Sequence, residues 1–201
     1  MEIDHAADVL LSGGTVIFPT DTVFGLGAHA LKKDAIEKIY EIKGRDRNKP
    51  INILISDIDK LDYIIEPMTK TEEKLANYWW PGPLTLVLNL KESKKNLYNF
   101  VKNDGTIGVR IPNNEKTREL IRKAGGIIAT TSVNFSGEEP ATSISDIDKK
   151  IINAVDYVVD FNEFSIKKPS TVVKIKGGKI EILREGALIM EDLERALKRA
   201  D

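Results

Sequence analysis

The stretch Gly13–Gly27, GGTVIFPTDTVFGLG, joins a short apolar segment to a polar cluster. Thr15–Pro19 has the composition of a buried β-strand, and the hydroxyls and carboxylate of Thr20–Thr22 follow it directly, before a predicted turn at Gly25–Gly27. Because α/β folds usually bind ligands where strands end, this cluster predicts a site for a polar small molecule. An ordinary turn with Asx-type hydrogen bonds is the alternative for this motif taken alone.

Segments of β-type composition alternate along the rest of the chain with segments of helical period, which predicts an α/β domain. The predicted strands are Thr15–Pro19, Ile51–Ile55, Leu84–Leu90, Thr106–Ile111, Ile127–Thr131, Tyr157–Phe161, Thr171–Ile175 and Lys179–Arg184. The predicted helices are Asp4–Leu11, Asp34–Lys43, Thr71–Tyr78, Glu115–Ala124, Ser145–Ala154 and Glu191–Ala200. Gly177-Gly178 between two strands indicates a tight antiparallel hairpin, so the sheet is expected to be mixed.

Composition narrows the class of protein. The 201 residues, 41% of them hydrophobic, suit a single domain spanning residues 1–201. A net charge of -1 provides no general attraction for a polyanion, and the lack of cysteine excludes disulfides, thiolate metal sites and a cysteine nucleophile. The N-terminal residues do not resemble a secretory signal, and no apolar run approaches the length of a membrane span, so we expect a cytoplasmic protein.

A basic loop, Lys43–Pro50, follows the second predicted helix and carries Lys43, Arg45, Arg47 and Lys49. Ammonium and guanidinium groups at this density suit a triphosphate, because they neutralise charge that would otherwise be repelled. A solvated basic loop is the alternative.

Further polar groups stand at the ends of other predicted strands. Thr106–Arg110, Thr130–Gly137, Ser170–Val173 and Arg184 add hydroxyls, an amide and guanidinium groups that could hold phosphate oxygens and a carboxylate. Trp80–Thr85, rich in proline, is interpreted mainly as structural. The P-loop, Rossmann, zinc-protease and nucleophile-elbow signatures are all missing from the sequence.

Taken together and in order, six motifs resemble the YrdC family over about residues 8 to 187. They are Pro19–Leu26, Lys43-Gly44-Arg45, Trp80–Thr85, Gly108–Pro112, Ser132-Val133-Asn134 and Ser170–Val173. The chain length resembles the short, single-domain members. The resemblance implies an open, twisted, mixed α/β sheet with a large, positively lined concave cavity.

The activity implied by this resemblance is that of a threonylcarbamoyl-AMP synthase, a nucleotidyltransferase. It would condense L-threonine, bicarbonate and ATP, with Mg²⁺, into threonylcarbamoyl-adenylate and pyrophosphate. A separate transferase complex would then use this product to modify the adenosine next to the anticodon of tRNA. Neither chemical step needs a protein nucleophile, so no catalytic nucleophile is expected, and the metal ligands are left open.

The family motifs also assign the site residues by position. Those expected to contact threonine are Thr20, Arg110 and Ser170, with the backbone near Thr130 and the side chain of Asn52. Those expected to hold ATP are Lys43, Arg47, Thr106, Ser132 and Arg184, with Arg45 and Asn134 in the same signature.

Three other functions are compatible with the same motifs. A basic concavity could bind double-stranded RNA without catalysis, although the net charge of -1 disfavours a broad RNA surface. A paralogue like the YciO branch would lack the synthase activity. A carbamoyl-transfer domain of the hydrogenase-maturation type normally lies within a larger chain. The intact Lys43-Gly44-Arg45 and Ser132-Val133-Asn134 motifs favour the synthase.

Overall fold

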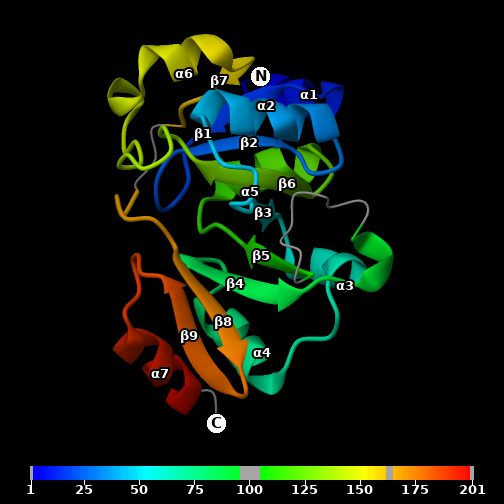
Figure 1. Cartoon of the computed structure of the whole chain (residues 1–201), viewed down its shortest axis with the longest axis vertical. Helices are drawn as coiled ribbons and strands as arrows, with labels where there is room; N and C mark the ends of the chain where they lie inside the picture. Colours follow the sequence, from blue (N-terminus) through cyan, green and yellow to red (C-terminus); the bar gives the residue numbers. More distant parts are fainter. Residues whose placement is uncertain (1, 96–104, 162–164, 200–201) are drawn as a thin grey trace.

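The computed structural model describes residues 2–95, 105–161 and 165–199, which contain one nine-stranded mixed sheet in the order β7-β1-β2-β6-β3-β5-β4-β8-β9 (Figure 1). The strands are β1 (Thr15–Phe18), β2 (Gly25–His29), β3 (Asn52–Ile55), β4 (Leu84–Asn89), β5 (Thr106–Arg110), β6 (Ile127–Ser132), β7 (Tyr157–Val158), β8 (Thr171–Lys176) and β9 (Lys179–Arg184). The α-helices are α1 (Glu2–Ser12), α2 (Lys33–Lys43), α3 (Leu61–Ile64), α4 (Lys70–Trp79), α5 (Glu115–Lys123), α6 (Lys149–Ala154) and α7 (Met190–Arg199). Short 3₁₀ turns lie at Ile58–Lys60, Glu92–Lys94 and Ile144–Asp146.

The expectation of a mixed sheet is confirmed. Strand β1 pairs antiparallel with β2 and parallel with β7, while β4 pairs antiparallel with β5 and parallel with β8. The glycine pair at Gly177-Gly178 connects β8 to β9 in an antiparallel hairpin in which Lys176 faces Lys179. This hairpin forms one edge of the sheet.

The prediction of a turn at Gly25–Gly27 is wrong, because these residues begin strand β2. Glycine usually weakens a strand, but here it makes room for an aromatic ring. A Cβ on Gly27 would stand 2.8 Å from the ring of Phe18 on the neighbouring strand. The buried ring of Phe18 therefore requires glycine at this position, and this packing is invisible to a local reading of the sequence.

Smaller differences concern the ends of elements. The helix expected at Ser145–Ala154 is a 3₁₀ turn followed by α6, and the strand expected at Tyr157–Phe161 is paired only at β7. Helix α3 was not anticipated. The last residue of the helix expected at Glu191–Ala200 lies outside the described residues.

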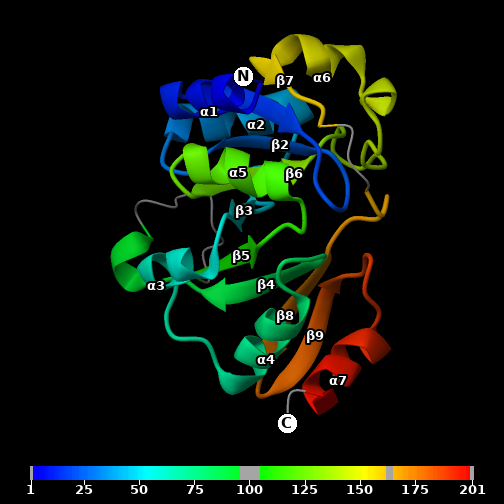
Figure 2. The same ribbon diagram turned by 180° about the vertical axis from the view of Figure 1, so that it is seen from behind.

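The sheet separates two apolar clusters, because alternate residues of a strand point to opposite faces. On one face Ile17, Leu26 and Ile53 belong to a cluster with residues of α2, α4 and α7. On the other face Phe18 and Leu54 pack with residues of α1 and α5, which lie together in Figure 2. We call this second face the α1/α5 face.

Helices α1 and α5 contact β1, β2, β3 and β6 but leave the β5, β4 and β8 part of the α1/α5 face uncovered. The strand registers place Thr85, Asn52, Arg110 and Thr130 on this same face. Several polar side chains therefore lie on the uncovered part of a face whose covered part is apolar. The sheet itself forms the floor of a cavity there.

One irregularity interrupts the hairpin at the sheet edge. Val173 faces Ile182 and Val172 faces Arg184, so the pairing register shifts by one residue at Leu183. The shift is a β-bulge, and Leu183 is its extra residue, without a partner on β8 between Val172 and Val173.

No helix within the described part of the chain combines the length and the apolar character needed to cross a membrane.

Candidate active site

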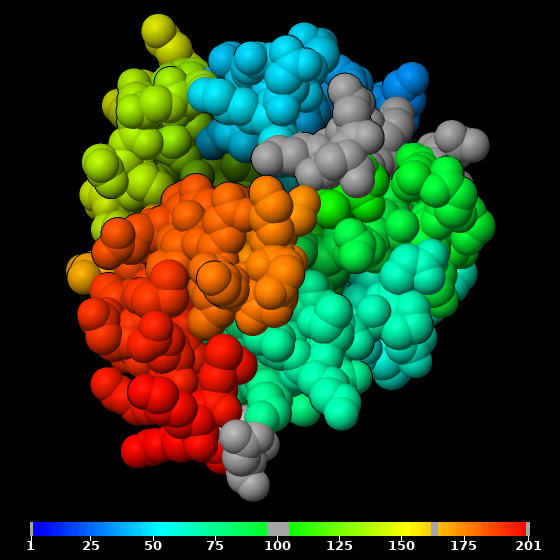
Figure 3. Space-filling model, turned by 60° about the horizontal axis from the view of Figure 1, so that its bottom comes forward, coloured from blue at the N-terminus to red at the C-terminus, as the bar shows by residue number. Residues whose placement is uncertain are grey.

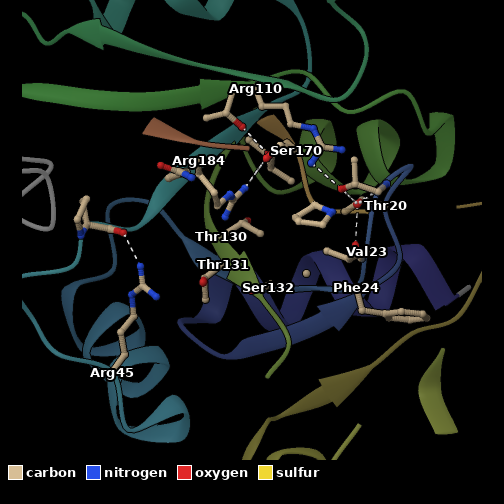
Figure 4. Close-up of a pocket in the computed structure, with 17 residues that line it drawn as sticks. Thr20, Val23, Phe24, Arg45, Arg110, Thr130, Thr131, Ser132, Ser170 and Arg184 are labelled. Carbon is tan, nitrogen blue, oxygen red and sulfur yellow. Dashed lines mark hydrogen bonds between the residues drawn. The ribbon is translucent and has the colours of Figure 1, made fainter. Parts of the chain in front are cut away.

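A cavity of about 110 Å³ lies on the uncovered part of the α1/α5 face (Figure 4). Its walls come from the loop after β1, the loop between α2 and β3, the end of β6, and the ends of the β8–β9 hairpin. In Figure 3 the cyan segment after α2, the yellow-green segment after β6 and the orange hairpin border a recess. The lining residues are Thr20, Thr22–Gly25, Arg45, Pro50, Asn52, Leu54, Thr85, Arg110, Thr130–Ser132, Pro169, Ser170 and Arg184.

Arg110, at the end of β5, is held by three hydrogen bonds. Its Nε donates to the carbonyl oxygen of Gly82 at 3.0 Å, its Nη1 donates to Thr22 Oγ1 at 2.8 Å, and its Nη2 forms an ion pair with Asp21 Oδ1. Burial lowers the pKa of Arg110, and the carboxylate of Asp21 opposes this effect. Arg110 is thus a buried cation with its own counter-charge, and we call this part of the cavity the paired end.

Arg184 and Ser170 form a second group on the opposite wall. Arg184 Nη2 donates to the carbonyl oxygen of Ser170 at 2.7 Å and to its hydroxyl at 3.1 Å. The same hydroxyl shares a hydrogen bond of 2.8 Å with Thr85 Oγ1. Desolvation lowers the pKa of Arg184, and the nearby cations Arg110 and Arg45 lower it further. Arg184 therefore feels the charge of both other guanidinium groups of the cavity.

Arg45 comes from the basic loop and lines the cavity from the side of α2 (Figure 4). Its Nη2 donates to the carbonyl oxygen of Pro50 at 3.0 Å, and its pKa is lowered by burial. Among the described residues, neither Arg45 nor Arg184 forms an ion pair with a carboxylate. We call the part of the cavity that these two arginines line the unpaired end.

Lys43 lies behind the cavity and holds the chain that leaves β6. Its ammonium donates to the carbonyl oxygen of Ser132, to the carbonyl oxygen of Asn134 at 2.6 Å and to the side-chain oxygen of Asn134 at 3.1 Å. Burial, followed by the charge of Arg45, lowers the pKa of Lys43 to about 7, while Glu138 opposes the shift. Lys43 therefore positions the loop after β6 and does not line the cavity.

Asn134 has the same supporting role. Its side-chain oxygen also accepts a hydrogen bond of 2.6 Å from the hydroxyl of Ser132. Its side-chain nitrogen donates to the carbonyl oxygens of Phe135 at 2.8 Å and Glu138 at 2.9 Å. With Lys43, this amide fixes the orientation of Ser132, which does line the cavity.

A second compartment, of about 260 Å³, adjoins the cavity on the same face of the sheet. Its floor includes Thr106 and Gly108 of β5, and three apolar side chains, Val87, Val172 and Leu183, contribute to its walls. Arg45, Pro50, Asn52 and Arg184 line both spaces and so form the boundary between them.

The structure thus brings together most of the residues that the sequence singled out. Eight of them line the first cavity: Thr20, Arg45, Asn52, Arg110, Thr130, Ser132, Ser170 and Arg184. Thr106 lines the second compartment, whereas Lys43 and Asn134 support the site from behind. Arg47 stands apart, because its side chain is 63% exposed and pairs with Glu37 at 2.8 Å.

Two predicted threonine contacts have distinct surroundings in the structure. The hydroxyl of Thr20 donates to the carbonyl oxygen of Val23 at 2.7 Å and accepts from the backbone N–H of Thr22 at 3.1 Å, so it shapes the loop. The hydroxyl of Thr130 is buried without a partner among the described residues.

Sequence reasoning missed the contribution of Trp80–Thr85, which it interpreted mainly as structural. Thr85 lines the cavity, and the carbonyl oxygen of Gly82 accepts a hydrogen bond from Arg110. Thr85 was detectable as a hydroxyl among the apolar residues Leu84 to Leu88 of this strand. Its neighbours Leu84 and Leu86 point to the opposite face, because side chains alternate along a strand. The ion pair between Asp21 and Arg110 joins residues far apart in the chain and carries no local signal.

Comparison with known proteins gives a consistent assignment. The Sua5_yciO_yrdC family model, described as telomere recombination, matches residues 8–186. A Methanocaldococcus jannaschii protein provisionally named a threonylcarbamoyl-AMP synthase is 38% identical over 189 residues, covering 92% of this chain and 86% of its own length. The Pyrococcus abyssi threonylcarbamoyl-AMP synthase is 34% identical over 198 residues, covering 98% of this chain.

The chain spans 57% of that Pyrococcus abyssi protein. A crystal structure of P. abyssi Sua5 complexed with L-threonine has a TM-score of 0.88 and 34% identity to this chain, and the match covers 97% of this chain and 57% of the other. The alignment of sequence and the agreement of fold extend over nearly all of the described residues. The chain therefore belongs to the Sua5/YciO/YrdC family.

Proposed function

We propose that the chain is a threonylcarbamoyl-AMP synthase, a nucleotidyltransferase that joins L-threonine, bicarbonate and ATP and releases pyrophosphate. The observation that carries the proposal is the contrast within one cavity. A buried arginine with its own carboxylate lies opposite two arginines without one, in a chain 34% identical to a protein of that name.

The paired end suits the amino acid. A guanidinium has five N–H donors, and Arg110 uses three of them, one on each nitrogen. One N–H on each terminal nitrogen is left, which matches the two oxygens of a carboxylate. Because Asp21 balances the charge of Arg110, this end favours a zwitterion over a simple anion. The related Pyrococcus abyssi structure is described as complexed with L-threonine.

The unpaired end suits the phosphates of ATP. Arg45 and Arg184 present guanidinium groups without acidic partners in the part of the chain that the structure describes, so a phosphate group would gain from contact with both. The neighbouring compartment, with Val87, Val172 and Leu183 in its walls, has the apolar character that a purine ring requires.

The proposed chemistry needs positioning and charge neutralisation. The ammonium group of threonine first gives a proton to water. The resulting amine attacks the carbon of bicarbonate, the C–N bond forms, and the hydroxyl of bicarbonate leaves as water with a second proton from nitrogen. An oxygen of the resulting carbamate then attacks the α-phosphorus, and pyrophosphate leaves. Arg45 and Arg184 would stabilise the charge that develops on the phosphates, and Arg110 would hold the amino acid in place.

Magnesium enters the proposal as part of the ATP substrate. Within the described ranges, no group of three or more His, Cys, Asp or Glu side chains is placed to hold a metal ion. A Mg²⁺ ion bound to ATP keeps phosphate oxygens and waters as ligands and needs few protein side chains, so no step is assigned to it.

The product is a mixed anhydride, so it calls for a second enzyme that accepts an acyl group. In the cytoplasm, this chain would act before a transferase complex that modifies the adenosine next to the anticodon of tRNA. Residues 1–201 would form one catalytic domain. Direct RNA binding is the lesser alternative, since a net charge of -1 gives little attraction for a polyanion.

The test is incubation of the purified protein with ATP, Mg²⁺, bicarbonate and L-threonine. We expect pyrophosphate release that depends on threonine, together with threonylcarbamoyl-adenylate detected by mass spectrometry. Pyrophosphate release that is the same with and without threonine, or the absence of this adenylate, would contradict the proposal.

A further inference from the structure

Asn52 stands at the boundary between the two compartments. It is the first residue of β3, it faces Thr130 of β6 in the antiparallel register, and it lies beside Gly108 of β5. It lines both the first cavity and the second compartment, together with Arg45, Pro50 and Arg184. A group held by this side chain can therefore be reached from both spaces.

The amide of Asn52 leans over a residue without a side chain. A Cβ on Gly108 would stand 2.1 Å from Asn52 Oδ1, so only glycine at 108 allows this position. The amide makes no hydrogen bond to any side chain or backbone group of residues 2–95, 105–161 or 165–199. Both its donor and its acceptor are thus free for a ligand in the half-buried space between the compartments.

The proposed reaction sets a geometric requirement at this boundary. Threonine in the first cavity and ATP in the second compartment must react with one common carbon, the one supplied by bicarbonate. That carbon must bond first to the amine and then, through oxygen, to the α-phosphorus, so it has to lie where the two spaces meet. The side chains at that place are Asn52, Arg45 and Arg184.

Bicarbonate and carbamate share a hydrogen-bonding pattern that the side-chain amide of asparagine can recognise. Each is a planar group with a donor and an acceptor side by side: the O–H and an oxygen in bicarbonate, the N–H and an oxygen in carbamate. A carboxamide also presents one acceptor and one donor in a plane, so it can form two hydrogen bonds with either. A guanidinium has donors only and cannot make this pair.

On this basis, and resting on the proposed function, we propose that Asn52 holds bicarbonate and then the carbamate formed from it, while Arg45 and Arg184 neutralise the negative charge. This differs from the assignment of Asn52 to the threonine pocket that the family resemblance implies. The amide forms hydrogen bonds with the donor and one oxygen of the planar group. The other oxygen is left to attack the α-phosphorus of ATP.

The test varies each substrate in turn with three purified variants in buffers freed of dissolved carbon dioxide. N52A removes the amide, N52D keeps its size but replaces it with an anion, and N48A is the matched control, an exposed asparagine four residues away. Threonine-dependent pyrophosphate release gives the KM for each substrate, and the Tm shows that each variant is folded.

We expect N52A to raise the KM for bicarbonate about tenfold or more, with the KM values for threonine and ATP within about twofold of the wild type. N52D should raise the bicarbonate KM further, because a carboxylate repels bicarbonate and cannot donate. N48A should match the wild type in all three values.

A rise in the threonine KM with an unchanged bicarbonate KM would overturn the inference and return Asn52 to the threonine pocket. Equal changes in all three KM values would also overturn it, because they would indicate a structural role. Failure of the proposed function itself is distinguishable, since the wild-type protein would then show no threonine-dependent activity.

Discussion

The paired and unpaired ends of the cavity carry similar side chains in opposite electrical settings. Arg110 is buried and balanced by Asp21, whereas Arg45 and Arg184 have only carbonyl and hydroxyl oxygens as partners among the described residues. Desolvation lowers the pKa of all three guanidinium groups, but a carboxylate opposes it only for Arg110. The presence or absence of a carboxylate beside each arginine therefore indicates which kind of ligand that end of the cavity accepts.

Removing Arg110 is expected to have the largest effect. R110A should lower kcat/KM for threonine by about 100-fold or more, since it removes a buried charged contact and leaves Asp21 unpaired. Steady-state kinetics of pyrophosphate release would measure the loss, with circular dichroism to establish folding. R122A, which breaks an exposed ion pair with Asp57, is the control and should keep wild-type kinetics.

If R110A were folded and retained its kcat/KM for threonine, the carboxylate would bind elsewhere. The paired end would then be structural, and the distinction between the two ends would lose its functional meaning.

Removing Arg184 is expected to have a smaller effect, because part of this side chain is open to solvent. R184A should raise the KM for ATP about tenfold and change the KM for threonine by less than about threefold. Initial rates at varied ATP concentration measure this. R195A, on the exposed side of α7, is the control. An effect on threonine larger than that on ATP would reverse the assignment of the two ends.

Replacing the counter-charge would make the two ends alike. D21N keeps an oxygen that can accept from Arg110 but removes the negative charge, so the paired end becomes cationic. We expect threonine to bind about threefold to tenfold more weakly, and 3-hydroxybutanoate, which lacks the ammonium group, to bind more tightly. Titration calorimetry with both ligands measures the change, and D57N is the control. Parallel changes for the two ligands would show that Asp21 acts by orientation alone.

The last expected effect is on stability and not on catalysis, and it concerns Lys43 and pH. Its pKa in the folded protein is about 7, compared with 10.5 for the ordinary side chain, so between these values the unfolded chain binds more protons. The free energy of unfolding should therefore rise with pH across this range, by at most about 1.4 kcal/mol per pH unit. In K43M the rise should be flatter. Urea titrations from pH 7 to pH 10 test this, and K198M, at an exposed site on α7, should keep the wild-type slope.

Much of the site could be predicted from the sequence because its residues follow strands. Arg110, Ser132 and Ser170 end or precede strands whose apolar composition is clear, and strand ends meet at one place in an α/β fold. Arg47 shows the limit of this reasoning. Charge density in a loop does not reveal that Glu37, on the preceding helix, binds this arginine at the surface.

The parts that could not be predicted depend on contacts across the sheet. Strand β2 begins with glycines because of a ring on its neighbour, and the charge balance of Arg110 depends on a loop residue from the other half of the chain. Local propensity has no access to either. The mixed sheet and the hairpin were accessible because glycine pairs and apolar runs are local features.

The bulge at Leu183 also sets the direction of a charge. Without the bulge, Leu183 would face Val172 and Arg184 would face Thr171. The guanidinium would then point to the other face of the sheet, which α2, α4 and α7 cover. Deleting one apolar residue would thus remove a cation from the cavity while every charged residue stayed in the chain. The electrostatics of the unpaired end are therefore encoded partly in the length of a strand, and alignments that ignore a one-residue gap in this hairpin would miss the change.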